Sequence, residues 1–376
     1  MVQLLYFGRL DQEKWRDAII AMIEYFSDTE TKTLPFVVHI FGKWSYEKKV
    51  CQLAEQFPQH IIYYGFQPLE KVKKTAKSCD YCLMPSLFLE TFGLSAVNAL
   101  ARWLPVIWYQ QWGMTPFVID DYNLSSNPGL PDVQLVAMTK KLLTKWRHGE
   151  SKKCQNIAKE YNKQQRINNF NKMLNPSLHE ESKKILLVTD FMNKLGGIET
   201  YVHDIATLLQ EQWHTVQIIW SSGGKTKYLR IVSMFISLWN IFFAWKLHKK
   251  IKAFDPDIIR CHSVLRHIGW LGLRTINKSP AQKWMMYHDL WYFHPFPHQV
   301  TQEKQIARSL DWKDFSASIH SPIEKFFVWW KRLLLKKIQK QLRQFDQHLV
   351  PSDFMQEAVV KNYNNKPTTL SHFIQD

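Results

Sequence analysis

The stretch VQLLYFGRL, residues 2–10, decides the fold of the first half of the chain. Its first six residues, Val2–Phe7, form a mostly apolar run of the length expected for a strand buried on both faces, and Gly8 ends that run. A helix is expected next, from about Glu13 to Phe26, and apolar strands continue to alternate with helices as far as Tyr109. This alternation predicts a parallel, doubly wound sheet.

The same pattern starts again after a polar, proline-containing segment at residues 175–182. A buried strand is expected at Ile185–Val188, a helix at Ile198–Glu211 and another strand at Val216–Trp220, followed by further pairs. The sequence therefore predicts an α/β protein with two Rossmann-like domains. We place the first at residues 1–174, the linker at 175–182 and the second at 183–376.

Composition narrows the partners of this 376-residue chain. A formal net charge of +16 favours anionic partners, such as a nucleotide diphosphate or an anionic membrane surface. Nucleic acid is not expected as a partner, because paired Cys/His finger spacing, basic heptads and an RNP-like strand are missing from the sequence. The five cysteines are odd in number and scattered, which is typical of reduced thiols and predicts a cytoplasmic protein.

Two groups of motifs resemble a known family. The first comprises FGRL at residues 7–10, Glu13-Lys14, and Pro85-Ser86 followed by ETFGL at residues 90–94. It resembles the donor-binding half of family 4 retaining glycosyltransferases of the GT-B fold. The second begins with ILLVTDF at residues 185–191 and LGGIETY at residues 195–201, and resembles the acceptor-side half. The halves thus stand in reversed order.

The resemblance implies a function for each half. Residues 1–174 would bind a nucleotide-diphosphate sugar, and residues 183–376 would face a glycan or lipid-linked acceptor. The implied reaction is a metal-independent sugar transfer with retention, without a cofactor, in polysaccharide biosynthesis. The basic, aromatic stretch Lys325–Ile338 predicts an amphipathic helix, which either lies on the anionic inner face of the membrane, making the protein peripheral there, or packs between the domains.

On the donor side, the resemblance assigns Arg9 and Lys14 to the diphosphate. Fixed cations at the carboxyl ends of parallel strands stabilise a leaving diphosphate well. Glu90 would contact the donor sugar and support charge on its oxocarbenium-like centre, which makes it one of two expected catalytic residues. The full set expected to bind the donor is Gly8, Arg9, Lys14, Phe92, Gly93, Leu94 and Asn98.

Asn98 departs from the family pattern, which has a glutamate there that accepts hydrogen bonds from the ribose. Loss of a charge-assisted bond lowers donor affinity by about 1–3 kcal/mol. On the acceptor side, Gly196 and Gly197 form a loop before a helix, and His288 is the second expected catalytic residue. Because of Asn98, a sugar-nucleotide-binding module without transfer activity stays open as an alternative, as does a nucleotide-sugar epimerase on the same fold.

Glycine is scarce and tryptophan abundant: the chain has 13 glycines and 16 tryptophans. Several tryptophans stand where short turns or the family pattern favour glycine, namely Trp15, Trp44, Trp103, Trp112 and Trp213. Glycine suits such positions because it adopts positive φ without strain. We hypothesise that some of the tryptophans written in the sequence are encoded by UGA codons, which the organism translates as glycine. The alternative is genuine replacement by tryptophan.

The reversed order of the halves leaves two interpretations open. The chain is either a circular permutant, whose halves share one cleft, or it pairs the end of one tandem enzyme with the beginning of another. Permutation is physically allowed, since chain ends often lie close together. We favour the tandem or truncated interpretation, because a misread UGA codon displaces gene boundaries.

Overall fold

The computed structural model describes residues 1–10, 18–27, 30–43, 45–86, 91–109, 117, 123–124, 131–144, 151–173, 182–190, 197–221, 240–265, 267–293, 322–363, 367–370 and 372. The described residues form two compact units. One reaches from Met1 to Lys163, and the other from Gln164 to His372. Helix α7 (Lys163–Met173), which the sequence places in the first domain, lies almost entirely in the second unit.

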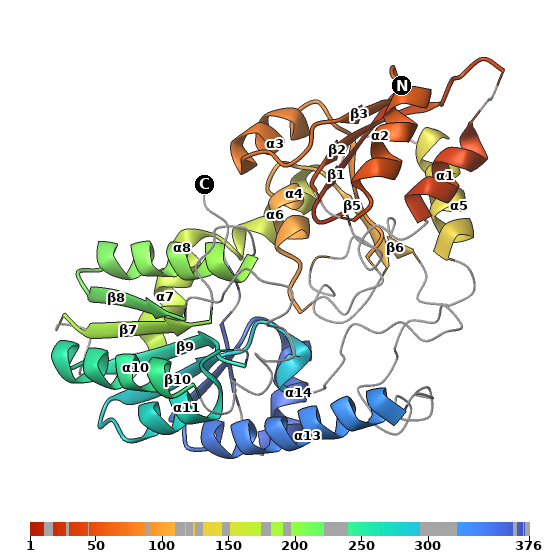
Figure 1. Ribbon diagram of the computed structural model, residues 1–376. Helices are drawn as coiled ribbons and strands as arrows, with labels where there is room; N and C mark the ends of the chain where they lie inside the picture. The colour runs from red at the N-terminus through yellow and green to blue at the C-terminus, as the bar shows by residue number, and fades with distance from the viewer. Residues whose placement is uncertain are drawn as a thin grey trace. The chain divides into compact units, whose positions relative to one another are not determined.

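The first unit is built on a six-stranded sheet of order β3-β2-β1-β4-β5-β6, and every neighbouring pair is parallel (Figure 1). Its strands are β1 (Val2–Phe7), β2 (Phe36–Phe41), β3 (Ile61–Tyr63), β4 (Tyr81–Met84), β5 (Val106–Tyr109) and β6 (Asn123–Leu124). Its helices are α1 (Ala18–Phe26), α2 (Glu47–Gln56), α3 (Leu69–Ala76), α4 (Leu94–Leu100), α5 (Pro131–Thr144) and α6 (Ser151–Lys159). The strand order reverses direction between β1 and β4.

The second unit repeats this design with the order β12-β11-β10-β9-β7-β8, again parallel throughout. Its strands are β7 (Lys184–Thr189), β8 (Thr215–Trp220), β9 (Ile258–Ser263), β10 (Gln282–Met286), β11 (Gln347–Val350) and β12 (Thr368–Thr369). Besides α7, its helices are α8 (Gly197–Glu211), α10 (Ile241–Phe254), α11 (Gly269–Asn277), α13 (Pro322–Leu342) and α14 (Asp353–Tyr363). The direction reverses between β7 and β9. The predicted fold class, two Rossmann-like α/β domains, is confirmed.

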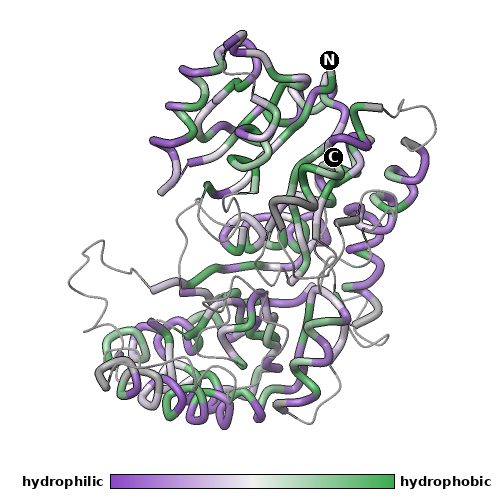
Figure 2. The backbone as a smooth tube through the Cα atoms, turned by 90° about the vertical axis from the view of Figure 1, so that its right-hand side faces the viewer, coloured by the Kyte–Doolittle hydropathy of each residue, from purple (hydrophilic) through white to green (hydrophobic). Residues whose placement is uncertain are grey.

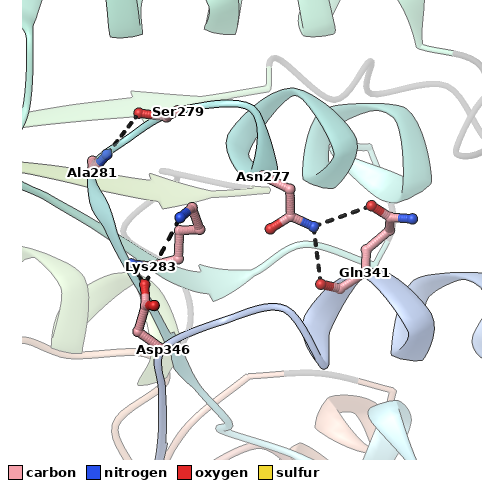
Figure 3. Close-up of polar contacts among 6 residues, drawn as sticks. All are labelled: Asn277, Ser279, Ala281, Lys283, Gln341 and Asp346. Carbon is pink, nitrogen blue, oxygen red and sulfur yellow. Dashed lines mark hydrogen bonds and ion pairs between the residues drawn. The ribbon is translucent and has the colours of Figure 1, made fainter.

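Burial explains why these sequences become strands and helices. All six residues of β2 are buried, as are the last five of β7. Hydrophilic and hydrophobic residues alternate along the helices (Figure 2), as expected of helices that bury one side. Strand starts are aligned by carboxylates: Asp80, Asp257 and Asp346 each accept a backbone N–H of a neighbouring strand at 2.7 Å, the last from Lys283 (Figure 3).

Two tryptophans adopt a backbone conformation that favours glycine. Trp103 follows α4 with a φ of 69°, and Trp213 follows α8 with a φ of 65°. At each, two backbone bonds close the helix: the Trp103 N–H donates to Leu100 and the next N–H to Ala99, and the Trp213 N–H donates to Gln210 with the same pattern beyond it. This is the Schellman motif, in which the left-handed residue is usually glycine.

The other three positions of this hypothesis, Trp15, Trp44 and Trp112, lie outside the described residues. None of the helices in the described ranges combines the length and apolar character needed to cross a bilayer. All five cysteines are free thiols.

Candidate functional site

The carboxyl end of β1 carries Gly8 and Arg9, as predicted. The Gly8 N–H donates to Phe41 at the end of the neighbouring strand β2, at 3.0 Å, and the Tyr6 hydroxyl donates to the carbonyl oxygen of Arg9 at 2.7 Å. These bonds fix the backbone of the loop while the Arg9 side chain is exposed. A fixed backbone with an exposed cation above a sheet is a suitable arrangement for a ligand anion.

Gly42, which the sequence analysis did not single out, allows this loop to form. A Cβ at this position would collide with the carbonyl oxygen of Gly8, and Gly42 has a φ of 149°. Its N–H donates to Gly65, so the loops that follow β1, β2 and β3 approach one another through glycine backbones. The sequence does contain a signal for this arrangement: Gly8 and Gly42 come directly after β1 and β2, and Gly65 comes two residues after the end of β3.

Phe92, Gly93 and Leu94 follow β4, which is the other neighbour of β1. Gly93 is left-handed, with a φ of 84°, and begins α4. Phe92 is buried, with its ring 5.2 Å from that of Phe117 and 5.5 Å from that of Tyr161. The predicted donor-binding residues of this segment and those of the β1 loop therefore follow adjacent strands at the point where the sheet order reverses. Ligands bind at this point in doubly wound sheets.

Asn98 uses its side-chain amide within its own helix, where Nδ2 donates to the carbonyl oxygen of Leu94 at 2.9 Å. It also lines a hollow of about 10 Å³ beside Phe7 and Arg102, which has room for about one water molecule. This hollow is far too small for a nucleotide. Glu90, Lys14 and Gly196 lie outside the described residues, so their roles stay predictions.

In the second unit, the carboxyl ends of β9 and β10 carry a buried histidine cluster. His288 follows β10, and its Nε2 lies 3.0 Å from Nδ1 of His262 on β9. The His288 ring stacks on His372 with a centroid distance of 5.2 Å and meets the ring of Tyr201 from α8 edge-on at 5.0 Å. Three separate elements thus hold the predicted catalytic histidine in one orientation.

Electrostatics keep this cluster neutral. Burial, together with the nearby cations Arg260 and Arg166, lowers the pKa of His288 to about 3. Burial likewise lowers the pKa of His262. At neutral pH each imidazole therefore has one N–H donor and one acceptor nitrogen. His288 is suited to hydrogen bonding with a sugar or hydroxyl group, and not to acting as a cationic acid.

Two buried arginines bind the hydroxyl group of Tyr201, which packs against His288. Arg260 Nη2 donates to the hydroxyl oxygen of Tyr201 at 2.9 Å, and Arg166 of α7 donates to the same oxygen. Burial lowers the pKa of Arg260 to about 9. Sequence analysis missed this network because its members come from α7, α8 and β9, which are far apart in the chain.

Asp190, at the carboxyl end of β7, organises the neighbouring loop. It is fully buried, and its Oδ1 accepts the N–H groups of His267 and Ile268 at 3.0 and 2.9 Å, near the start of α11. Gly197, the first residue of α8, is exposed after the same strand. Gly197 and Asp190 therefore lie at the reversal point of the second sheet. Among the described residues, no group of three or more His, Cys, Asp or Glu side chains is arranged so that it could hold a metal ion.

Comparison with known proteins identifies the two halves of the chain. Residues 2–165 match the family "Glycosyl transferases group 1", and residues 195–374 match the family "Glycosyltransferase Family 4". The two units are thus a pair of glycosyltransferase domains of the GT-B class, with the group 1 domain first. The resemblance inferred from the motifs is confirmed.

A curated relative is the lipopolysaccharide 1,2-N-acetylglucosaminetransferase of Salmonella typhimurium, 25% identical over 167 residues, which are 41% of this chain and 43% of the relative. The chain thus matches less than half of that protein's length. Similar solved structures include HepE of Anabaena with UDP and glucose (17% identity, TM-score 0.34, 42% of this chain and 43% of that one). Another is the catalytic domain of the Helicobacter pylori cholesterol-α-glucosyltransferase (15% identity, TM-score 0.31, 42% and 96%).

Proposed function

We propose that the first unit binds a nucleotide-diphosphate sugar, that the second unit faces the acceptor, and that such a pair transfers the sugar with retention to a glycan or lipid-linked acceptor. The observation that carries the proposal is the position of the expected residues. Gly8, Arg9 and Gly93 lie at the reversal point of one sheet, and Gly197 at that of the other. Both reversal points belong to glycosyltransferase domains.

The chemistry assigned to the first unit is stabilisation of the leaving diphosphate. Arg9, together with Lys14, supplies positive charge without a metal ion, and the glycine backbones of the β1 and β2 loops allow phosphate oxygens to approach closely. Glu90 is assigned to the anomeric centre, where positive charge develops as the glycosidic bond breaks. Each of these groups would contribute most in the transition state, when the diphosphate gains charge.

The role assigned to His288 is hydrogen bonding. Its neutral imidazole, held by His262 and Tyr201, orients a sugar hydroxyl or the acceptor rather than delivering a proton from a cationic state. The free cysteines fit a reducing compartment, so we place this activity in the cytoplasm, with contact to the inner face of the membrane where a lipid-linked acceptor would be met.

One observation favours a second candidate, a sugar-nucleotide-binding module without transfer. Asn98 lacks the charge of a carboxylate, and its amide is already bonded to Leu94 within α4. Such a module would bind a nucleotide sugar and leave it intact.

Incubation with a panel of nucleotide sugars, with and without acceptors, separates the candidates. Release of nucleoside diphosphate with the sugar transferred or hydrolysed supports the proposal. A rearranged sugar on the intact nucleotide indicates an epimerase, and binding without any change indicates the module. Failure of every nucleotide sugar to bind overturns the donor site itself.

A further inference from the structure

Three neighbouring helices cover one face of the sheet in the second unit. Helix α11 packs between α10 and α13, and α8 lies over the opposite face (Figure 1). The α11–α13 contact is fixed by Asn277, whose Nδ2 donates to the backbone oxygen of Gln341 at 3.0 Å and to its side-chain oxygen at 3.1 Å (Figure 3). The outer sides of these helices therefore form one continuous surface.

This surface is strongly basic. Over the lengths of α10, α11 and α13 the sequence has one acidic residue, Glu324. The basic residues of the three helices are Lys246, Lys249, Lys250, Lys252, Arg274, Lys325, Lys331, Arg332, Lys336, Lys337 and Lys340. Helix α8 has the opposite composition, with Glu199, Asp204 and Glu211 and no lysine or arginine. With eleven basic residues and one acidic residue, these three helices thus account for +10 of the chain's formal net charge of +16.

Large apolar side chains stand among these charges. On α10, Phe242 is 88% exposed and Trp245 58%, and on α13, Phe326 is 51% and Trp329 54% exposed. On α10, residues 242, 245 and 249 follow helical spacing on the side opposite the buried Phe243, Leu247 and Phe254. We call Phe242, Trp245, Lys249, Phe326, Trp329 and Lys336 the basic-aromatic face.

Basic and apolar groups are arranged side by side on this face. The Lys249 ammonium lies 3.7 Å from the Trp245 ring centroid, and the Phe326 and Trp329 rings are 6.1 Å apart. A folded protein in water gains nothing by exposing a phenylalanine almost fully beside lysines. An anionic membrane surface accommodates both, because headgroups attract the lysines while the rings enter the boundary of the acyl chains.

We propose that the basic-aromatic face of α10 and α13 docks the second unit onto an anionic lipid bilayer. The proposal deepens the proposed function, and it rests on that function only for the acceptor, since a lipid-linked acceptor would be met at this face. Aliphatic side chains favour a bilayer over nucleic acid: Ile241 is 63% exposed and Leu333 38%. Nucleic acid offers stacked bases and phosphates but no hydrocarbon region for them to enter.

The test is co-sedimentation of the full chain with vesicles of phosphatidylcholine alone and with about 30% phosphatidylglycerol added. We expect binding only to the anionic vesicles, and weaker binding at high salt. The double variant Phe242→Ser/Phe326→Ser should bind anionic vesicles at least about tenfold more weakly than the wild type. The variants Lys249→Gln and Lys336→Gln, which each remove one positive charge, should each lower the affinity for anionic vesicles by about fivefold. Both phenylalanines were chosen because they do not depend on the identity of any tryptophan letter.

Matched controls come from the first unit. Phe66→Ser removes a side chain that is 62% exposed, and Lys77→Gln removes an exposed lysine at the end of α3. Both variants should bind anionic vesicles as strongly as the wild type does. Circular dichroism shows whether each variant is folded, and surface substitutions of this kind should leave it so.

Three results would overturn the proposal: equal binding to neutral vesicles, unchanged binding of the phenylalanine double variant, or binding to single-stranded RNA in place of vesicles. None of these readouts uses nucleotide-sugar turnover. A chain that binds anionic vesicles through this face but ignores every nucleotide sugar would refute the proposed function alone, and the converse would refute the docking surface alone.

Discussion

Replacement of Trp213 by glycine and by alanine should have different effects on stability. Trp213 has a φ of 65° at the end of α8, and it is 86% exposed, so loss of its ring removes little buried area. Both variants lose that ring equally. Only alanine keeps the strain of a left-handed L-residue, about 1–2 kcal/mol. Glycine gains more freedom in the unfolded chain, which offsets about 0.4–1 kcal/mol. Trp213→Gly should therefore be about 0.5–1 kcal/mol more stable than Trp213→Ala.

The assay is urea denaturation followed by circular dichroism, on both variants and on a Trp213 parent protein expressed with UGG at that codon. The matched control is Thr207, an exposed residue in the middle of the same helix. There the sign reverses: Thr207→Ala should be more stable than Thr207→Gly by about 1 kcal/mol. If the alanine variant is as stable as the glycine variant, or more stable, at both positions, residue 213 does not adopt the left-handed conformation. The same comparison at Trp103, with a φ of 69°, should give the same sign.

The remaining predictions concern the two sites. Arg9→Ala and Lys14→Ala should each weaken nucleotide-sugar binding by about 1.5–3 kcal/mol in titration calorimetry with the fold intact, whereas Lys77→Ala should not; unchanged affinity in both would remove the diphosphate assignment. Asn98→Glu should tighten binding if the ribose lies against that position, and weaker binding would indicate another donor pose. His288 has a folded pKa of about 3, below its unfolded value of about 6.5, so its contribution to stability is complete above the unfolded value and is lost as pH falls toward the folded one. Urea midpoints should fall from pH 7 to pH 5, less steeply in His288→Gln, and an equal slope in that variant would contradict a neutral buried His288.

The hypothesis that some tryptophans are really glycines also predicts which codons the gene carries. If the organism reads UGA as glycine, codons 103 and 213 are UGA, and the native protein is lighter than the written sequence by the Trp-to-Gly difference at each such codon. Sequencing the gene and weighing the intact protein check this. UGG at both codons would refute recoding, and genuine tryptophans would then occupy two strained positions.

Much of the fold could be predicted because its strands are nearly continuous apolar runs. Such runs as Phe36–Phe41 and Ile185–Val188 must be buried on both faces, and helices between them require parallel crossovers. Residues 151–173 form two helices, α6 and α7, because the chain turns at Tyr161, whose ring packs against Phe92 and Phe117. A local pattern does not reveal such a distant contact.

The sites were predictable only in part. Motif residues such as Arg9 and Gly93 follow strands, so their place at the carboxyl end of a sheet follows from the alternation of elements. Asp190 and Gly42 were missed as loop organisers because their partners lie 78 residues away in one case and on a neighbouring loop in the other. The neutral state of His288 depends on burial against Tyr201, His262 and His372, contacts that the sequence does not show.

The central claim is that the first unit binds a nucleotide-diphosphate sugar at the junction of β1 and β4. Titration calorimetry of wild type, Arg9→Ala and His288→Ala with the best nucleotide sugar from the panel, and with its free nucleoside diphosphate, tests it most directly. We predict that the wild type binds both ligands, that Arg9→Ala binds both at least about tenfold more weakly, and that His288→Ala binds the nucleoside diphosphate as the wild type does. Equal binding by Arg9→Ala and wild type, or loss of nucleoside diphosphate binding in His288→Ala alone, would contradict the claim.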